Sequence, residues 1–255
     1  MMQLETAVQI AGHSLVVLQN TTRDSSFQEK AGIWWYQTQT NLNAMLTNTD
    51  SMPLEVSAAA RAWGLKKQLV IHQFLTPDSD QIGLIARFAA AGFVLTNRHY
   101  LMNQDLKLQL ELPVPWRVFC AENQKQIKQI SSAAKEILLN LAQLPPSPLG
   151  VRLYAAQDSS QIVAWARVAQ LQPDTAWLDD LFTRVAWRKR GVMASILQRI
   201  DQDAITFGAH QMLLFSGQHN LEYHLGHGYE KVAIKLRFAA PPTWFERIKN
   251  KFKAS

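Results

Sequence analysis

The segment over residues 177–197 constrains the fold most, because a strand, a tight basic turn and the start of a helix follow one another there without a break. Three basic residues, Arg188 to Arg190, precede Gly191, and apolar positions then recur at three- and four-residue steps, as on one face of a helix. The first turn of a helix presents unpaired backbone N–H groups and the positive end of the helix dipole. Gly191 lets the backbone approach a ligand closely, and the basic side chains add positive charge. The segment therefore predicts an anion site suited to a diphosphate.

The pattern around this segment predicts an α/β domain in the second half of the chain. Short polar gaps separate the first strands, which is typical of antiparallel hairpins. Gly208 and Gly228 stop the two later helices. The expected order is helix, three strands, helix, strand, helix and strand, over residues 123–144, 151–156, 162–170, 176–184, 193–207, 212–215, 220–227 and 229–238.

The first half of the chain ends in a similar succession. A helix that stops at Gly64 precedes a strand over residues 69–74, and a helix closed by Gly92 precedes a strand that starts at Phe93. This order matches the order around the glycine stops of the second half. We therefore expect a tandem repeat of one α/β fold, with chance similarity of two ordinary α/β segments as the alternative.

Prolines 113 and 115 interrupt a strand-like alternation and mark the expected boundary between the halves. We expect an N-terminal domain over residues 1–112, a catalytic domain over 116–240 and a basic amphipathic tail over 241–255. A proline cluster over residues 145–150 is interpreted as a loop inside the second domain. For the tail, a solvated helix packed by its aromatic residues is favoured over a contact with a membrane surface or nucleic acid.

Composition narrows the class of protein. With 47% hydrophobic and 18% charged residues the chain has an ordinary globular balance, so disorder is not expected. The one cysteine, Cys120, cannot form an internal disulfide, which favours a reducing compartment. The sequence lacks the pattern of a secretory signal and the ~20 apolar residues of a membrane span, so we expect a soluble, cytoplasmic protein. A net charge of +6 favours a polyanionic ligand such as a nucleotide cofactor or nucleic acid.

Residues 177–197 resemble the GNAT superfamily of N-acetyltransferases, whose cofactor loop follows Gln/Arg-x-x-Gly-x-Gly/Ala. Arg188, Gly191 and the helix after them fit this pattern, whereas Met193 occupies its final small-residue position and Val185 stands where proline is common. The resemblance implies an α/β (α+β) fold with a mixed, mostly antiparallel central sheet flanked by helices. It also implies two lobes, of which the N-terminal one is a degenerate copy.

The resemblance implies acetyl-coenzyme A as the co-substrate. No metal is expected, because His219, His224 and His227 are five and three residues apart with no supporting Cys or Asp. In the family, the strand before the loop separates from its neighbour, and its backbone pairs with the pantetheine arm. By resemblance that task falls to Phe182 and Thr183, and Asn220 would face the pantetheine or the phosphate arm. The other expected cofactor-binding residues are Arg188, Lys189, Arg190, Gly191, Val192, Met193 and Ala194.

Acetyl transfer to an amine needs an uncharged nucleophile, a polarised thioester carbonyl and a proton for the leaving sulfur. Asp179 or Asp180 is the candidate base, and a structural salt bridge or a contact with the charge of the substrate is the alternative. On a strand these neighbours point to opposite faces, so only one is expected to face the cleft. His224 falls where the family has a tyrosine that protonates the thiolate. A histidine titrates near neutral pH and can donate this proton, with Tyr223 as the alternative.

The N-terminal half has no such loop before the helix that stops at Gly64. We expect it to cover the acceptor cleft or to serve as a packing partner, with residues 34–36 either in the core or in an aromatic wall for substrate. The predicted function is transfer of acetyl from acetyl-coenzyme A to a primary amine of a small molecule or peptide, by direct attack. The alternative is a noncatalytic acyl-coenzyme A sensor or partner-binding protein. Nucleic acid is a less favoured partner, and a homodimer is compatible with the sequence.

Overall fold

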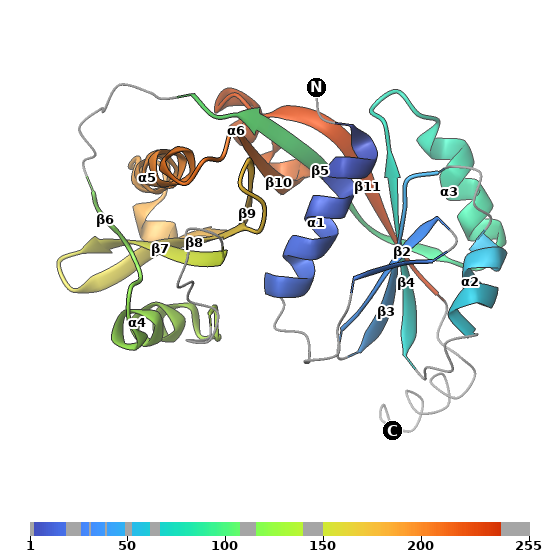
Figure 1. Cartoon of the computed structure of the whole chain (residues 1–255), viewed down its shortest axis with the longest axis horizontal. Coiled ribbons are helices and arrows are strands. Elements are labelled where there is room, and N and C mark those ends of the chain that lie inside the picture. Colours follow the sequence, from blue (N-terminus) through green and yellow to red (C-terminus); the bar gives the residue numbers. More distant parts are fainter. Residues whose placement is uncertain are drawn as a thin grey trace. The chain divides into compact units, whose positions relative to one another are not determined.

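The computed structural model describes residues 3–18, 27–30, 32–38, 40–48, 53–61, 67–107, 116–139 and 150–240. Figure 1 labels their helices and strands. In chain order the elements are α1 (Leu4–Leu18), β1 (Gln28–Lys30), β2 (Ile33–Gln37), β3 (Asn41–Leu46), α2 (Pro53–Arg61), β4 (Gln68–Leu75), α3 (Gln81–Ala90), β5 (Val94–Asp105), β6 (Arg117–Cys120), α4 (Gln124–Ala134), β7 (Gly150–Asp158), β8 (Gln161–Gln170), β9 (Thr175–Thr183), η2 (Val185–Trp187), α5 (Val192–Thr206), β10 (Gln211–Gly217), η3 (Gln218–Asn220), α6 (Leu221–Gly226) and β11 (Glu230–Ala239).

The chain forms two compact units. Unit 1 takes in the described residues up to Leu101 together with residues 216–223 and 231–240, and unit 2 takes in those of 102–215 and 224–230. Strand β5 therefore begins in unit 1 and ends in unit 2.

Unit 1 is a mixed sheet with helices on both faces. Its strand order is β1-β2-β3-β4-β11-β5, in which β3 and β4 are parallel while β1–β2, β2–β3 and β4–β11 are antiparallel. Helices α2 and α3 cover one face, where Phe88 of α3 stacks on Phe238 with ring centroids 4.0 Å apart. Figure 1 shows α1 on the other face of this sheet. There Trp34 stacks on Phe27, whose ring contacts His13 of α1.

The last strand of the chain, β11, completes the sheet of unit 1. It pairs with β4 from Ile234 opposite Leu75 to Ala239 opposite Val70. The predicted strand over residues 229–238 is confirmed as a strand, but no local pattern predicts its partner, which lies far earlier in the chain. The assignment of the activity to residues 116–240 stays a prediction. The expected boundary at Pro113 and Pro115 and the tail over 241–255 lie outside the described residues.

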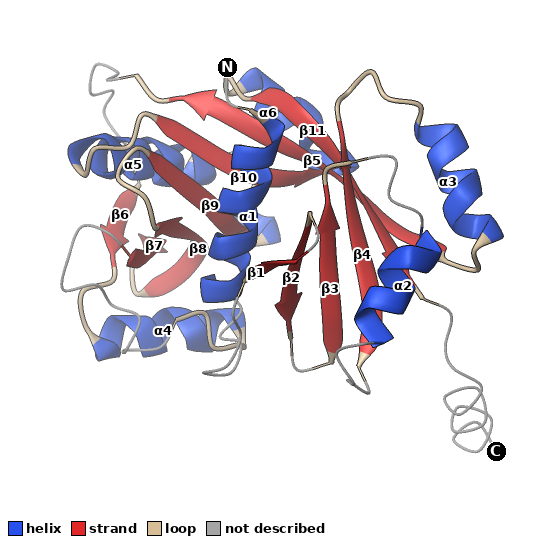
Figure 2. Ribbon diagram, turned by 45° about the vertical axis from the view of Figure 1, so that its right-hand side comes forward, coloured by secondary structure: helices blue, strands red, loops and turns tan. Residues whose placement is uncertain are grey.

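Unit 2 has the strand order β5-β10-β9-β8-β7-β6. Strands β6, β7, β8 and β9 form antiparallel neighbours, and β9 and β10 are parallel. Helices α4 and α5 both contact β8 and lie on opposite faces of the β7–β8 hairpin (Figures 1 and 2). The expected fold class, a mixed and mostly antiparallel sheet flanked by helices, is confirmed in this arrangement.

Two helices differ from the sequence predictions. The pattern predicts that helix α4 runs to residue 144, but it ends at Ala134, because Lys135 adopts a left-handed backbone (φ 61°) and its N–H bonds the Ser131 carbonyl. Helix α1 is absent from the predicted elements. Its buried positions recur at helical steps, which is the signal that could have revealed it, and they are Ala7, Val8, Ile10, Ala11, Ser14 and Leu18.

Further expectations concern the aromatic run and the cysteine. Trp35 and Tyr36 are 1% and 3% exposed, so they belong to the interior and form no substrate wall. Cys120 is a half-buried free thiol. Burial raises its pKa to about 11, and the nearby charge of Asp203 adds a smaller increase, so the thiol stays protonated and unreactive at neutral pH.

No helix in the described ranges is long and apolar enough to cross a membrane.

Candidate active site

Strands β9 and β10 pair only at their first positions and then separate. Parallel pairs join residues 175–178 to residues 211–214, ending at Leu178 opposite Leu214. Strand β9 continues to Thr183 and β10 to Gly217, and in the described structure no further pair joins them. The family resemblance implied this separation. It leaves backbone N–H and C=O groups of β9 along an edge that an extended ligand can pair with.

A bulge reshapes β9 where the two strands part. Against β8, Arg167 pairs with Asp179 and Trp165 with Phe182, so two residues of β9 stand opposite the single Ala166. Asp180 is in this bulge and has a left-handed backbone (φ 52°). That conformation costs a non-glycine residue roughly 1–2 kcal/mol. Bulges are common beside active sites, where they re-aim a side chain.

Both carboxylates of the acidic pair bind one arginine. Arg167 Nη2 lies 2.9 Å from Asp179 Oδ2 and 2.5 Å from Asp180 Oδ2. Arg167 Nη1 also donates to the Leu138 carbonyl at 2.9 Å, which fixes the guanidinium. The expectation that the two aspartates point to opposite faces is wrong, because the left-handed bulge at Asp180 breaks the alternation of the strand.

The carboxyl group of Asp180 has a pKa that is raised toward neutral pH. Burial raises its pKa to about 6, the negative charge of Asp179 adds to the increase, and Arg167 opposes it. Glu136 contributes a further, smaller increase. A carboxylate with this pKa is mostly deprotonated at pH 7 and can accept and release a proton near neutral pH.

The basic turn after β9 is exposed and held in place by its backbone. Arg188 Nε donates to the Thr183 carbonyl at 3.1 Å, and Trp116 Nε1 donates to the Arg190 carbonyl at 2.9 Å. Lys189 and Gly191 both have left-handed backbones, with φ of 59° and 75°. The acceptor in each contact is a main-chain carbonyl, and residues 188–190 are exposed.

Gly191 is the N-cap of α5, and no side chain caps this helix. A Cβ built on Gly191 would meet no atom within 4 Å, so the space in front of the helix is open. Inside the helix, Ser195 N donates to the Gly191 carbonyl at 3.0 Å. The residues that the sequence assigned to an anion site thus form an open helix start behind an exposed basic turn, which fits a diphosphate.

The other predicted cofactor residues lie on either side of this turn. Phe182 is 39% exposed and stacks on Trp165 with ring centroids 4.4 Å apart. The side chain of Val192 is buried and anchors α5 in the core, so only its backbone can face a ligand. Met193 is half-buried and Ala194 is exposed.

The candidate acids are neighbours on the short helix α6. His224 is 5% exposed, and burial lowers its pKa to about 4, with a smaller effect from His227. It is therefore neutral at pH 7, and the expectation that it titrates near neutral pH is wrong. Tyr223 is 40% exposed, and its pKa is raised by burial, so its phenol stays protonated. Asn220, at the end of η3, is also exposed.

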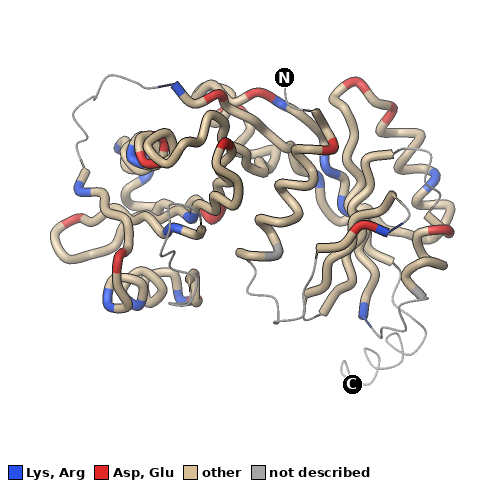
Figure 3. The backbone as a smooth tube through the Cα atoms, in the orientation of Figure 1, with Lys and Arg blue, Asp and Glu red and all other residues tan. Residues whose placement is uncertain are grey.

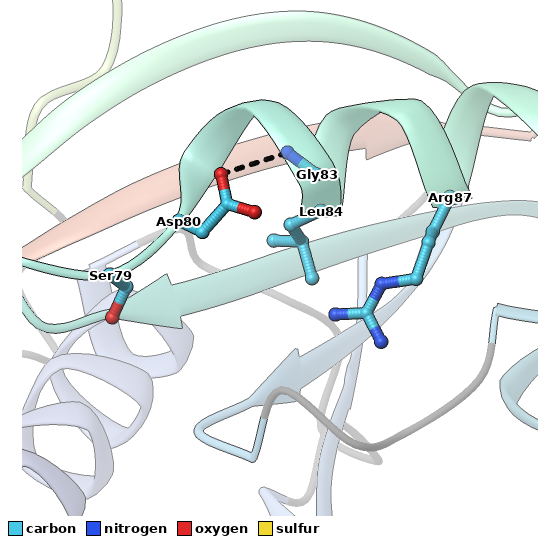
Figure 4. Close-up of a pocket in the computed structure, with 5 residues that line it drawn as sticks. All are labelled: Ser79, Asp80, Gly83, Leu84 and Arg87. Carbon is cyan, nitrogen blue, oxygen red and sulfur yellow. Dashed lines mark hydrogen bonds between the residues drawn. The ribbon is translucent and has the colours of Figure 1, made fainter.

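A depression of about 550 Å³ lies at the start of α3 in unit 1 (Figure 4). Asp80 Oδ1 accepts a hydrogen bond of 3.0 Å from the Gly83 N–H and so caps the helix. A Cβ on Gly83 would overlap Asp80 Oδ2, so the capping carboxylate would have to shift to make room for it. None of the predicted site residues lines this depression, whose lining residues are Ser79, Asp80, Gly83, Leu84 and Arg87.

In the described part of the chain, no three His, Cys, Asp or Glu side chains are grouped to hold a metal ion.

Residues 118–229 match the model of the acetyltransferase (GNAT) family. This range contains the separated strands, the basic turn and the opening of α5, so the chain carries a GNAT domain over these residues. Domains of this family transfer an acyl group from an acyl-coenzyme A. No curated protein matches the sequence.

Solved structures with the same fold cover nearly the whole chain. A GCN5-related N-acetyltransferase from Kribbella flavida has 15% identity and a TM-score of 0.68 over 95% of this chain and 97% of its own. A functionally unknown conserved protein from Staphylococcus epidermidis has 9% identity and a TM-score of 0.60 over 89% and 98%. A tandem GNAT protein from the clavulanic acid biosynthesis pathway has 9% identity and a TM-score of 0.54 over 83% and 79%. At these identities the likeness shows the fold alone.

Proposed function

We propose that the part of the chain over residues 116–240 transfers an acetyl group from acetyl-coenzyme A to a primary amine by direct attack. The observation that carries the proposal is the separation of β9 from β10 beyond Leu178, directly before an exposed basic turn that opens α5 at Gly191. An open strand edge and an open helix start suit the two ends of one long ligand, a polar arm followed by a diphosphate.

Acetyl-coenzyme A would supply the acetyl group as a thioester. The residues that would hold its arm are Phe182 and Thr183 on the free edge of β9, with Asn220 as a further polar contact. The backbone amides of Val192, Met193 and Ala194 would bind the diphosphate, and Arg188, Lys189 and Arg190 would add positive charge.

Asp180 is the proposed base. An amine with a pKa near ~10 arrives protonated at pH 7 and must lose a proton before it can attack. The Asp180 carboxylate, with its pKa of about 6, accepts this proton directly or through a water molecule. Asp179 shares Arg167 with it, and its negative charge supports the raised pKa.

Tyr223 is the proposed acid. Its phenol is partly exposed and protonated at neutral pH, so it has a proton to give to the departing thiolate. His224 is buried and neutral, and its ring packs edge-on against Tyr229 with centroids 5.5 Å apart. We assign it to packing.

The N-terminal part, residues 1–112, is the degenerate copy in this proposal. Strand β3, helix α2, strand β4 and helix α3 repeat the order of β9, α5, β10 and α6. However, β3 stays paired with β4 along its whole length, so in the described structure these two strands do not separate to leave an edge for a coenzyme arm.

The test is binding and turnover with a matched pair of glycine variants. Gly191→Glu puts a negative charge at the proposed diphosphate site and should weaken binding of acetyl-coenzyme A at least about tenfold, or about 1.4 kcal/mol. Gly32→Glu is the control, because Gly32 also has a left-handed backbone (φ 72°) and open space around it, but lies in the β1–β2 turn. Equal affinities in the two variants would refute the site.

Turnover separates the enzyme from the alternative of a noncatalytic sensor. Thiol release from acetyl-coenzyme A is measured with a panel of a polyamine, an aminoglycoside, amino acids and a lysine peptide. Release that depends on an amine supports the transferase. Tight binding of the coenzyme with no release for any amine supports the acyl-coenzyme A sensor.

A further inference from the structure

Strand β5 contacts residues 218–227, which contain η3 and α6, near each of their ends. Tyr100 Oη donates to Gln218 Oε1 at 2.6 Å, at the start of η3. Gln104 Nε2 donates to the His227 carbonyl at 2.8 Å, directly after α6. The first bond lies within unit 1 and the second within unit 2. We call residues 218–227 the η3–α6 segment.

The spacing of the two donors on β5 matches the length of this segment. Tyr100 and Gln104 are four residues apart on one strand, so they lie on the same face and roughly 13 Å apart. Nine helical steps, from residue 218 to residue 227, also rise roughly 13 Å. One face of the strand can therefore bind the segment at its first residue and at its last.

The segment needs such contacts, because a helix as short as α6, with six residues, is not stable by itself. Leu221 and His224 are buried and anchor one side of it, whereas most of the other residues are exposed. Glu222 is the one Lys, Arg, Asp or Glu of the segment, and among the described residues it forms no ion pair (Figure 3). The position of the exposed side therefore depends on hydrogen bonds to neighbouring elements.

Tyr100 is fixed through both its ring and its hydroxyl group. Lys231 Nζ lies 5.4 Å from the centroid of the ring, which is within the range of a cation–π contact. The bond from the hydroxyl to Gln218 is at the short end of the range for an O–H···O bond. Phenylalanine at this position would keep the ring contact and lose only the hydroxyl bond.

We infer that Tyr100 and Gln104 are positioning residues, which fix the η3–α6 segment and with it Tyr223. Their effect on catalysis rests on the proposed function, in which the Tyr223 phenol gives its proton to the departing thiolate. Tyr100 itself transfers no proton. Both positioning residues belong to the N-terminal part of the chain, residues 1–112, so this part supplies bonds on which the acid depends.

Hydrogen exchange of the whole chain, followed by mass spectrometry, tests the positioning without any turnover. Tyr100→Phe and Gln104→Met should each raise the exchange rates of backbone amides over residues 218–227 about three- to tenfold, as expected for the loss of one hydrogen bond. Tyr36→Phe is the matched control, because it also removes a hydrogen-bonded hydroxyl in unit 1, and it should leave this segment unchanged. A variant of Tyr100 or Gln104 that exchanges like the wild type here would overturn the role of that residue.

A double-mutant cycle connects the segment to the acid. Tyr100→Phe should lower kcat for the best acceptor about three- to tenfold in the wild type, and should have no further effect in Tyr223→Phe, where the acid is already gone. The same loss in both backgrounds would mean a general structural effect and would refute the link to Tyr223. Gln218→Glu keeps an acceptor for the phenol and should retain kcat, whereas Gln218→Met should resemble Tyr100→Phe.

The two measurements separate this inference from the proposed function. A wild type that turns over no amine would refute the proposed function. The exchange rates over residues 218–227 would still decide whether β5 positions the segment.

Discussion

The two parallel strand pairs, β3–β4 in unit 1 and β9–β10 in unit 2, begin alike and end differently. Residues 41–46 of β3 pair with residues 68–73 along the whole strand, whereas β9 pairs with β10 only as far as Leu178. At the fifth and sixth positions β3 has the buried Met45 and Leu46, and β9 has Asp179 and Asp180. The difference teaches that the separation of β9 from β10 coincides with a change from apolar residues to two carboxylates that bind Arg167.

The largest expected effect tests the proposed chemistry at the point where β9 separates from β10. Asp180→Asn keeps the shape of the side chain but removes the base, so kcat/KM for the amine should fall roughly 10²- to 10⁴-fold. Asp179→Asn is the matched control, because it leaves the Asp180 carboxylate in place, and it should lose less. Steady-state kinetics with the best acceptor of the panel decides this. An Asp180→Asn enzyme that turns over as fast as Asp179→Asn would remove Asp180 from the mechanism.

The second prediction concerns the core of unit 1, where the strands stay paired, and it is tested through the free energy of unfolding. Phe238 is 1% exposed on β11 and stacks on Phe88, so Phe238→Ala should destabilise the protein by about 3–5 kcal/mol in urea unfolding. Ile82→Ala, at an 82% exposed position of α3, should change stability by less than about 0.5 kcal/mol. If the two variants unfold at the same urea concentration, the last strand of the chain is not part of the unit 1 core.

The bulge at Asp180 also predicts a pH dependence. Its carboxyl pKa of about 6 lies above the ordinary value, so the basic form is lost as the pH falls through 6. Below that point kcat/KM should drop by about an additional tenfold per pH unit, beyond the slope that the amine's own ionisation imposes. Asp180→Asn should lack this break. A break that persists in the variant would belong to another group.

The sequence was enough to predict features that neighbouring residues make together, but not those that join segments far apart in the chain. The basic turn, Gly191 and the acidic pair follow one another in the chain, so their spacing was enough to predict an anion site. The pairing of β11 with β4 joins segments far apart in sequence, and periodicity gives no information about such a partner. The geometry of Asp180 was missed because strand alternation fails at a bulge, and no residue type announces that bulge.

The smallest expected effect separates backbone strain from ligand binding at the two left-handed glycines, Gly32 and Gly191. Both have open space where a Cβ would lie, so alanine at either position meets no neighbour and pays only for its positive φ, roughly 1–2 kcal/mol. Thermal unfolding of Gly32→Ala and Gly191→Ala without coenzyme should therefore give similar losses. Saturating acetyl-coenzyme A should restore part of the stability of Gly32→Ala, as it does for wild type, and less of that of Gly191→Ala, because the added methyl group lies where the backbone must approach the diphosphate. If the coenzyme restores the stability of the two variants equally, the start of α5 binds the diphosphate no more than the β1–β2 turn does.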